Sequence, residues 1–318
     1  MSNIMMSNLR GNRLLELLTE VENTNLEYRY SISYDKIITY GIEIEYENIS
    51  KYIVSKFIKK DHKNWLSKSD NSLDSGGEIS SPILHGTKED WIHLKEICNF
   101  LNRKKMNSLN NASFHIHVGR QVFSNCDELL LFIELYMIYE PILFRFGYGD
   151  KVSQRKNILK YSSPTTGELY TILPKLKECN SLEEMYCILS KLSRYNAINF
   201  SNINSDSDKK TIEYRLFNAS SNPIVLQNDI NTAINMSLTP KRNSIDKELL
   251  EYRINNELII ADRNDFWYNE VNILLALEFA DTFFDNDIDK IFFLKQYFKG
   301  YESNYGYNNA RYAKTFVK

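Results

Sequence analysis

Four short segments of the sequence each place two polar side chains two residues apart, with apolar residues between and around them. The pairs are Glu43 and Glu45, Glu78 and Ser80, His115 and His117, and Glu213 and Arg215. In a β-strand, residues i and i+2 point to the same face of the sheet. If the four segments share a sheet, that face gathers the carboxylate, imidazole and guanidinium groups that bind metal ions and phosphates.

The residues that alternate with these side chains are apolar or aromatic. They are Ile42, Ile44, Tyr46, Ile79, Ile116, Tyr214 and Leu216. The alternation therefore predicts that the opposite face of the sheet belongs to the hydrophobic core.

The polar face carries more negative charge than its own residues neutralise. Glu43 and Glu45 lie about 6.6 Å apart along a strand, and two like charges at that distance repel by about 2.5 kcal/mol at an effective dielectric constant of about 20. Glu78 and Glu213 add to this repulsion, whereas Arg215 supplies a single positive charge. The sequence therefore predicts one divalent cation or, better, two. Carboxylate oxygens favour Mg²⁺, and the imidazoles also admit Mn²⁺.

Composition narrows the class of protein. At 318 residues and 43% hydrophobic content, the chain is long enough to bury a sizeable core. A net charge of −2 argues against a broad basic surface for nucleic acid. The four cysteines lack C-x-x-C spacing, which indicates free thiols in a reducing compartment. The apolar stretch 129–146 is interrupted by Glu134, Glu140 and Pro141, which predicts a buried helix rather than a membrane span. We therefore expect a cytoplasmic protein with no nucleic-acid or membrane partner.

Apolar spacing predicts helices over 12–23, 88–102, 125–146, 182–192 and 225–236, and two more between 247 and 299. The first motif predicts a strand over 37–47, and 52–60 fits either a short helix or a strand. This order of elements indicates an α+β fold. We expect a helical extension at 1–35, a catalytic domain at 36–240, and C-terminal helices at 241–318 packed on that domain.

The motifs, in their order along the chain, resemble those of the amidoligase family, within the carboxylate–amine ligase superfamily that includes glutamine synthetase and glutamate–cysteine ligase. They are G-I-E-I-E-Y from Gly41, D-x-S-L from Asp70, G-G-E-I-S-S-P from Gly76, F-H-I-H-V-G from Phe114, R-Y-x-x-x-N from Arg194 and T-I-E-Y-R-L-F from Thr211. The resemblance covers about residues 37–230 and leaves both ends of the chain unaccounted for. Each motif alone is weak, but their shared order is specific.

The resemblance implies an antiparallel sheet, backed by helices, whose polar catalytic face binds ATP with two or three divalent ions. It implies that Glu43, His115 and Glu213 hold the metal that bridges the phosphates. Glu45 and Glu78 would hold the metal nearer the acceptor substrate.

The same resemblance implies that Arg215 contacts the transferring γ-phosphate and acts in catalysis together with Glu78 and Glu213. His117 would line the nucleotide site. Arg194 and Asn199 approach the last strand and are further candidates for binding the nucleotide phosphates.

The implied activity is ATP-dependent formation of an amide or isopeptide bond through an acyl phosphate. Its carboxylate and amine substrates would be small amino acids, peptides or proteins. Three alternatives stay open: a glutamate–cysteine ligase-like enzyme that makes γ-glutamyl bonds on free amino acids, a nucleotide-binding or kinase-like protein, and a degenerate binding module. The intact set of polar residues argues against degeneracy.

Several residues have a purely structural interpretation. Asp70 and Ser72 fit a turn as well as a substrate contact. Arg120 and Arg145 are further phosphate candidates, for which surface charge is the simpler interpretation. The two motif histidines also fit a metal hydrolase, but His62, His85 and His93, all upstream and none at a strand end, do not supply the further ligands that such an enzyme needs.

Overall fold

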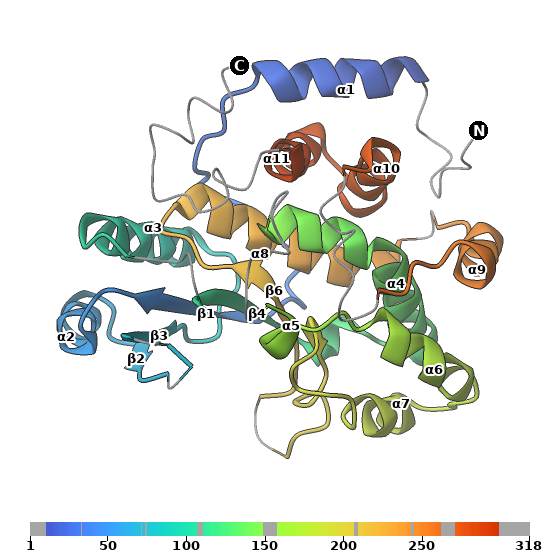
Figure 1. The fold of residues 1–318 in the computed structure, drawn as a ribbon, viewed down its shortest axis with the longest axis horizontal. Coiled ribbons are helices and arrows are strands. Elements are labelled where there is room, and N and C mark those ends of the chain that lie inside the picture. Colours follow the sequence, from blue (N-terminus) through green and yellow to red (C-terminus); the bar gives the residue numbers. More distant parts are fainter. Residues whose placement is uncertain are drawn as a thin grey trace.

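In the computed structural model, the chain forms a six-stranded antiparallel sheet with helices packed on one of its faces (Figure 1). The structure describes residues 11–32, 34–70, 72–73, 75–106, 111–148, 158–206, 209–242, 245–261 and 271–298. The strands are β1 (Tyr40–Glu47), β2 (Leu66–Lys68), β3 (Gly76–Ser80), β4 (Ser113–Gly119), β5 (Ile198–Asn199) and β6 (Thr211–Asn218), in the spatial order β2-β3-β1-β4-β6-β5. The expected α+β class and antiparallel sheet are confirmed.

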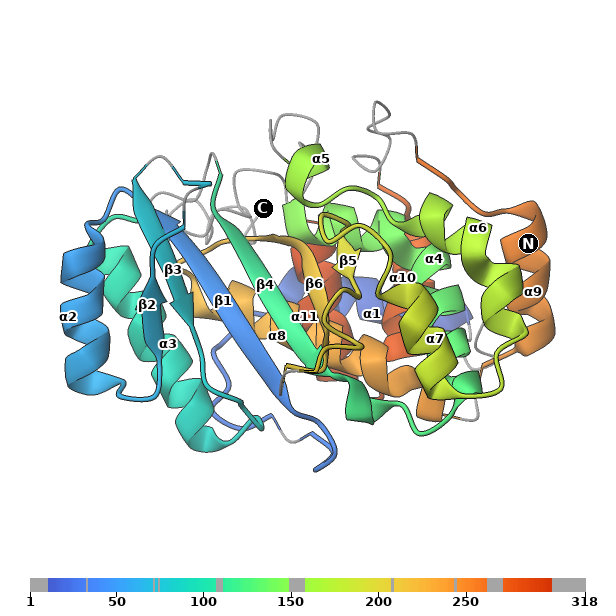
Figure 2. The same cartoon turned by 90° about the horizontal axis from the view of Figure 1, so that it is seen from below.

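Some of the helices form layers on the apolar face of the sheet, and others lie beside it. The helices are α1 (Gly11–Asn23), α2 (Lys51–Asp61), α3 (Lys88–Arg103), α4 (Cys126–Tyr148), α5 (Ile158–Tyr161), α6 (Thr166–Lys177), α7 (Leu182–Leu189), α8 (Pro223–Leu238), α9 (Lys247–Asn256), α10 (Ile273–Phe283) and α11 (Asp287–Phe298). In Figure 1, α3, α8 and α4 lie over the sheet, α10 and α11 pack on them, and α1 is outermost. From the opposite side, β1, β3 and β4 face the viewer without a covering helix, and α5, α6 and α7 flank them (Figure 2).

Strand register brings the predicted motifs together. On β1, Glu43 stands opposite Ser80 of β3 and His115 of β4. The apolar residues that alternate with the motif side chains are at most 1% exposed, so the predicted core face is confirmed. One hydrophobic cluster joins this face to the covering helices.

Some element boundaries differ from the prediction. The first strand begins at Tyr40 rather than at 37, because Asp35 accepts a hydrogen bond from the backbone N–H of Ile37 and closes a turn there. Residues 52–60 belong to a helix, α2. The described residues between 247 and 298 form three helices rather than two, α9, α10 and α11. Residues 1–10 and 299–318, parts of the two expected terminal units, lie outside the described residues, and the domain boundaries stay predictions.

A glycine at the start of β3 permits the close approach of β1. A Cβ atom on Gly76 would lie 1.8 Å from the carbonyl oxygen of Tyr46. We therefore expect Gly76→Ala to lower the free energy of unfolding by about 3 kcal/mol, measured by urea denaturation. Gly41→Ala is the matched control, because its Cβ would lie 3.6 Å from Ser81 Oγ, an ordinary contact. Equal stability losses in the two variants would contradict the prediction.

Candidate active site

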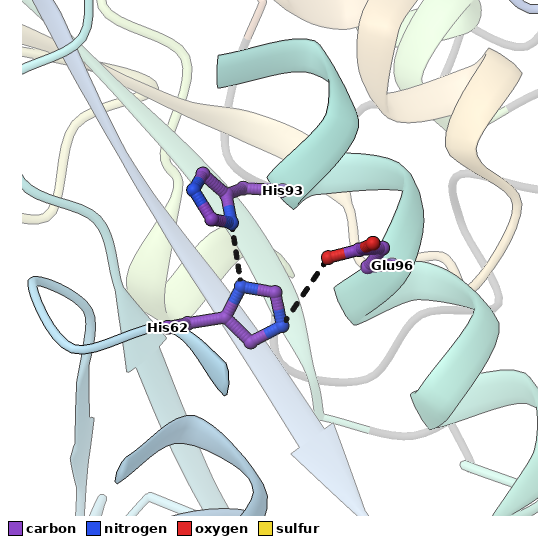
Figure 3. Close-up of side chains that lie close together, drawn as sticks. All are labelled: His62, His93 and Glu96. Atoms are coloured by element: carbon purple, nitrogen blue, oxygen red, sulfur yellow. Dashed lines mark hydrogen bonds and ion pairs between the residues drawn. The ribbon is translucent and has the colours of Figure 1, made fainter. Parts of the chain in front are cut away.

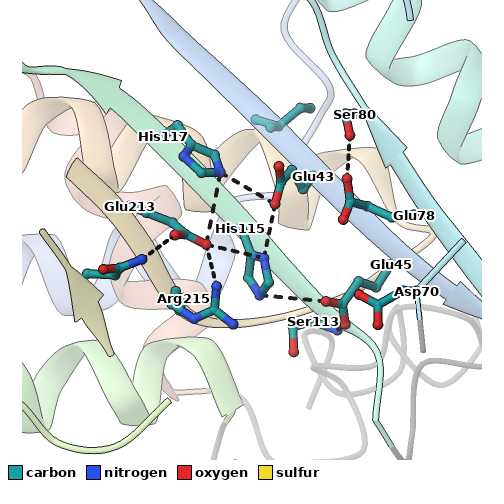
Figure 4. Close-up of polar contacts among 12 residues, drawn as sticks. Glu43, Glu45, Asp70, Glu78, Ser80, Ser113, His115, His117, Glu213 and Arg215 are labelled. Carbon is teal, nitrogen blue, oxygen red and sulfur yellow. Dashed lines mark hydrogen bonds and ion pairs between the residues drawn. The ribbon is translucent and has the colours of Figure 1, made fainter. Parts of the chain in front are cut away.

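The predicted polar face forms one cluster of side chains on the uncovered side of the sheet (Figure 4). The cluster contains Glu43 and Glu45 from β1, Glu78 and Ser80 from β3, His115 and His117 from β4, and Glu213 and Arg215 from β6. Direct cross-strand neighbours include Glu45 with Glu78 and His117 with Glu213. The four motifs, separated by up to about half of the chain, therefore meet at a single site.

His115 lies at the centre of the carboxylates and is only 5% exposed. Its Nδ1 atom is 3.3 Å from Glu43 Oε2 and 3.5 Å from Glu213 Oε1, and its Nε2 atom is 3.8 Å from Glu45 Oε1. Burial and the charge of Arg215 oppose protonation, but the hydrogen bond to Glu43 and the charges of Glu45 and Glu213 outweigh them. The pKa of His115 is therefore raised above its usual value.

Glu43 and Glu213 remain ionised although both are largely buried. Burial acts to raise the pKa of Glu43, but its hydrogen bond to His115 and the imidazole of His117, 3.4 Å away, prevail and lower that pKa. Burial also opposes ionisation of Glu213, and the charges of His117, Arg215 and His115 overcome it, so the pKa of Glu213 is lowered. These two carboxylates are therefore available as anionic ligands at neutral pH.

Arg215 and Asn199 fix the position of the Glu213 carboxylate. Arg215 Nη1 donates to Glu213 Oε1 at 2.5 Å, and Asn199 Nδ2 donates to Glu213 Oε2 at 2.6 Å. Arg215 Nε donates to the carbonyl of Tyr161 at 3.1 Å, so the guanidinium is held at two points. Asn199, predicted as a nucleotide-site residue, is thus part of the cluster.

The other end of the cluster is formed by Glu45 and Glu78. Glu45 accepts a hydrogen bond from the backbone N–H of Ser113 at 2.6 Å, and burial, with a contribution from Asp70, raises the pKa of Glu45. Glu78 accepts a short hydrogen bond from Ser80, and Lys68 Nζ lies 3.5 Å from it. A proton or a cation at this end would stabilise the pair.

Asp70 combines the two interpretations that the sequence left open. Its carboxylate accepts hydrogen bonds from the Ser72 backbone N–H at 2.7 Å and from the Ser72 hydroxyl at 2.6 Å, which closes a turn. Figure 4 also shows Asp70 beside Glu45. The turn therefore brings a further carboxylate to the edge of the cluster.

Three side chains of the cluster fit a metal ion. Glu43, His117 and Glu213 each offer a ligand atom, and these atoms lie within 4.8 Å of one another. His117 Nε2 is buried without a hydrogen-bond partner among the described residues, and it points toward Glu43 Oε2 at 3.4 Å. The Thr211 hydroxyl, 3.3 Å from His117 Nδ1, holds the other side of the ring, as partners of metal-bound histidines do. This donor set suits Mg²⁺ or Mn²⁺.

The metal ligands inferred from the resemblance were Glu43, Glu45, Glu78, His115 and Glu213, and the roles of all five stay predictions. The geometry adds His117 to Glu43 and Glu213 as a possible metal ligand. His115 instead contacts three carboxylates, those of Glu43, Glu45 and Glu213.

A cavity of about 470 Å³ opens beside this set. Its wall includes Glu43 and His117, the apolar side chains of Leu66, Pro82 and Ile83, and the basic residues Lys68, Arg120, Lys209 and Lys210. Volumes of this size are typical of pockets for nucleotide-sized ligands.

The remaining predicted phosphate ligands are three arginines in different surroundings, and their role stays a prediction. Arg194 is exposed, and its guanidinium lies over the ring of Tyr195. Arg120 donates to the carbonyl of Ile203 at 2.7 Å on the cavity wall. The expectation of surface charge is wrong for Arg145, which is buried on α4 with its guanidinium over Tyr297.

Two contacts of the site escaped the sequence interpretation although the signal was present. Ser113 stands two residues before His115, and Thr211 stands two residues before Glu213, so the same alternation places both on the polar face. Tyr161 had no comparable signal, because it lies on α5 and belongs to no strand motif. Lys209 and Lys210 directly precede β6, and Lys209 stands two residues before Thr211 in the same alternation.

The contacts of Glu43 with His115 and His117 make a testable contribution to stability. The lowered pKa of Glu43 means that its carboxylate stabilises the fold above pH 4.5 and loses this effect as the pH falls. The raised pKa of His115 means that its imidazolium stabilises the fold below pH 6.5 and loses this effect as the pH rises through the folded-state pKa. We therefore expect Glu43→Gln to cost about 2 kcal/mol between these pH values and less on either side.

This pH dependence is measured by urea unfolding of the metal-free wild type and variant across the range. A difference in stability that does not change with pH would contradict it.

The fold and the site define an α+β protein with a charged, open antiparallel sheet, and none of the described helices is long and apolar enough to cross a membrane. A family model described as "Putative amidoligase enzyme" matches residues 56–237, more than half of the chain, and the chain belongs to this amidoligase family. The match begins after β1, so the placement of Glu43 and Glu45 rests on the sheet geometry. A comparison with curated proteins finds no match.

Proposed function

We propose that the chain is an ATP-dependent carboxylate–amine ligase that uses Mg²⁺ or Mn²⁺ and forms an amide or isopeptide bond through an acyl phosphate. The observation that carries this proposal is the convergence of Glu43, His117 and Glu213 beside the guanidinium of Arg215. Family membership supports the ligase class and implies the use of ATP.

Along the sheet, the site runs from a nucleotide-sized cavity, through His115 and Arg215, to a second pair of carboxylates. This order would place a transferring phosphoryl group between a nucleotide and an acceptor substrate. The cavity, with Thr211 and Gly119, lies at one end, and Glu45 and Glu78 lie at the other. His115 and Arg215 stand between them. We place the nucleotide in the cavity, its γ-phosphate at Arg215, and the carboxylate and amine substrates beside Glu45 and Glu78.

The chain's own groups have distinct tasks in this arrangement. A divalent ion held by Glu43, His117 and Glu213 would offset their charge and that of the phosphates. Arg215, fixed by Glu213 and Tyr161, presents its remaining donors to the phosphoryl oxygens. The basic residues on the cavity wall attract the other phosphates.

The proposed reaction has two steps, phosphorylation of the carboxylate and attack of the amine on the acyl phosphate. A carboxylate oxygen of the first substrate attacks the γ-phosphorus of ATP, and the bond to the ADP oxygen breaks. The amine nitrogen then attacks the acyl carbon, the C–O bond to phosphate breaks, and the amine loses a proton. The products are the amide, ADP and inorganic phosphate.

The first experiment is calorimetric titration of the purified chain with ATP, with and without Mg²⁺. We expect micromolar binding that requires the metal. A panel of carboxylic acids is then incubated with ATP and hydroxylamine as the amine, and hydroxamate, ADP and phosphate are measured. Absence of metal-dependent ATP binding would refute the proposed site, and formation of AMP with pyrophosphate would refute the acyl phosphate.

A further inference from the structure

A second cluster of possible metal ligands lies between the end of α2 and the middle of α3, apart from the sheet site. It consists of His62, which follows α2, and His93 and Glu96, which stand three residues apart and share a face of α3 (Figure 3). Each offers one ligand atom, and these atoms lie within 4.8 Å of one another. Residue spacing does not bring His62 into this cluster, because His62 and His93 are 31 residues apart.

Hydrogen bonding alone does not satisfy this cluster. His62 is 1% exposed, and its Nδ1 atom lies 2.8 Å from His93 Nδ1. Its Nε2 atom is buried without a hydrogen-bond partner among the described residues and lies 3.9 Å from Glu96 Oε2. If His62 donates through Nδ1, the Nε2 lone pair faces a carboxylate. If it accepts through Nδ1, a buried N–H is left without an acceptor.

We propose that His62, His93 and Glu96 bind a structural divalent ion of the zinc class, with water completing the coordination. Two imidazoles and a carboxylate are ligands that Zn²⁺ takes in tetrahedral sites. Ligand atoms around such an ion lie about 3.4 Å apart, so His62 Nε2 and Glu96 Oε2, now 3.9 Å apart, need to approach by about 0.5 Å. The His93 ring, which now contacts His62 Nδ1, needs to turn toward the ion. The Glu96 side chain is 55% exposed and is therefore free to make this movement.

The surroundings of His62 support a structural task. Its ring packs against Phe57, which stacks on Phe100, so an apolar wall backs one side of the cluster. The backbone carbonyl of His62 accepts from Trp65 N–H at 2.9 Å and shapes the turn into β2. An ion at this point would tie the entry of the edge strand β2 to α3. It would thereby support β3, which carries Glu78.

The test is calorimetric titration with Zn²⁺ of the full chelator-treated chain carrying Glu43→Gln and Glu213→Gln, which disable the sheet site. We expect one equivalent to bind at micromolar concentration or below. Addition of His93→Gln should weaken binding at least thirtyfold and abolish the rise in melting temperature that zinc produces. Glu96→Gln should weaken binding about tenfold.

His85→Gln and Glu89→Gln are matched controls, since His85 is exposed just before α3 and Glu89 is exposed in its first turn. Both should bind zinc as the parent chain does. The substituted ligands are chosen at His93 and Glu96, rather than at buried His62, so that the variants stay folded. Zinc binding that is unchanged by His93→Gln, or no zinc binding in the parent chain, would overturn the proposal. Neither result bears on ATP binding at the sheet.

Discussion

Replacement of Glu213 by glutamine is expected to abolish metal-dependent ATP binding while the chain stays folded. Glu213 is 4% exposed, and its carboxylate accepts a 2.5 Å hydrogen bond from Arg215. The possible ligand atoms of Glu43, His117 and Glu213 lie within 4.8 Å of one another, close enough to share one ion. Glutamine keeps the volume but removes the negative charge that a divalent ion needs. We expect the dissociation constant for ATP with Mg²⁺ to rise at least a hundredfold, which corresponds to about 2.8 kcal/mol, measured by calorimetry.

Glu140→Gln is the matched control for this result. Glu140 is also a buried carboxyl group, but it lies on α4 and accepts hydrogen bonds from Tyr136 and from the backbone of Thr165 and Thr166. It should bind ATP like the wild type, even if its melting temperature falls. If Glu213→Gln retains the ATP affinity of the wild type and is folded by circular dichroism, Glu213 is outside the nucleotide site.

The composition of the polar face could be predicted because it depends only on local backbone geometry. Alternate residues of a strand face opposite sides, so Ile42 and Ile44 in the core require Glu43 and Glu45 on the other face. The α+β class and the antiparallel sheet follow from the same motifs and their resemblance. The order of the strands and the register between neighbours depend on pairing between residues far apart in the sequence. The alternation within each strand does not specify this pairing.

An irregularity in the pairing of β4 and β6 shows this limit. Phe114 stands opposite Phe217, but Ile116 stands opposite Tyr214, so two residues of β6, Arg215 and Leu216, face the single His115. Such bulges re-aim side chains beside active sites. Here Arg215 bonds to Glu213 while Leu216 stays fully buried. The surroundings of His115 therefore depend on a register that the alternation alone does not reveal.

The contact between α2 and α3 is a second case. His62 belongs to no strand motif, yet the fold brings its Nδ1 atom 2.8 Å from His93 Nδ1. Residue type and spacing predict ligands that share one element, such as His93 and Glu96 on α3. Ligands on separate elements become visible only when the elements pack.

Arg215→Lys is expected to lower kcat at least a hundredfold while changing the dissociation constant for ATP less than threefold. Arginine holds Glu213 through Nη1 and the Tyr161 carbonyl through Nε, which leaves further donors for the phosphoryl group. Lysine keeps the charge, and therefore the long-range attraction for ATP, but one ammonium cannot make both contacts and also present a planar pair of donors. The transferring phosphoryl group then loses hydrogen bonds that matter most in the transition state, so the loss falls on kcat.

The measurement is ADP formation at saturating ATP, together with calorimetric ATP binding. Arg194→Lys is the matched control, because Arg194 is exposed and lies over the ring of Tyr195, whose neighbour Tyr161 accepts the Arg215 hydrogen bond. This control should leave kcat within threefold of the wild type if Arg194 is remote from the phosphates, and a large loss would instead support its predicted place in the nucleotide site. Small, equal changes in kcat and ATP affinity for Arg215→Lys would mean that Arg215 supports Glu213 without touching the phosphate.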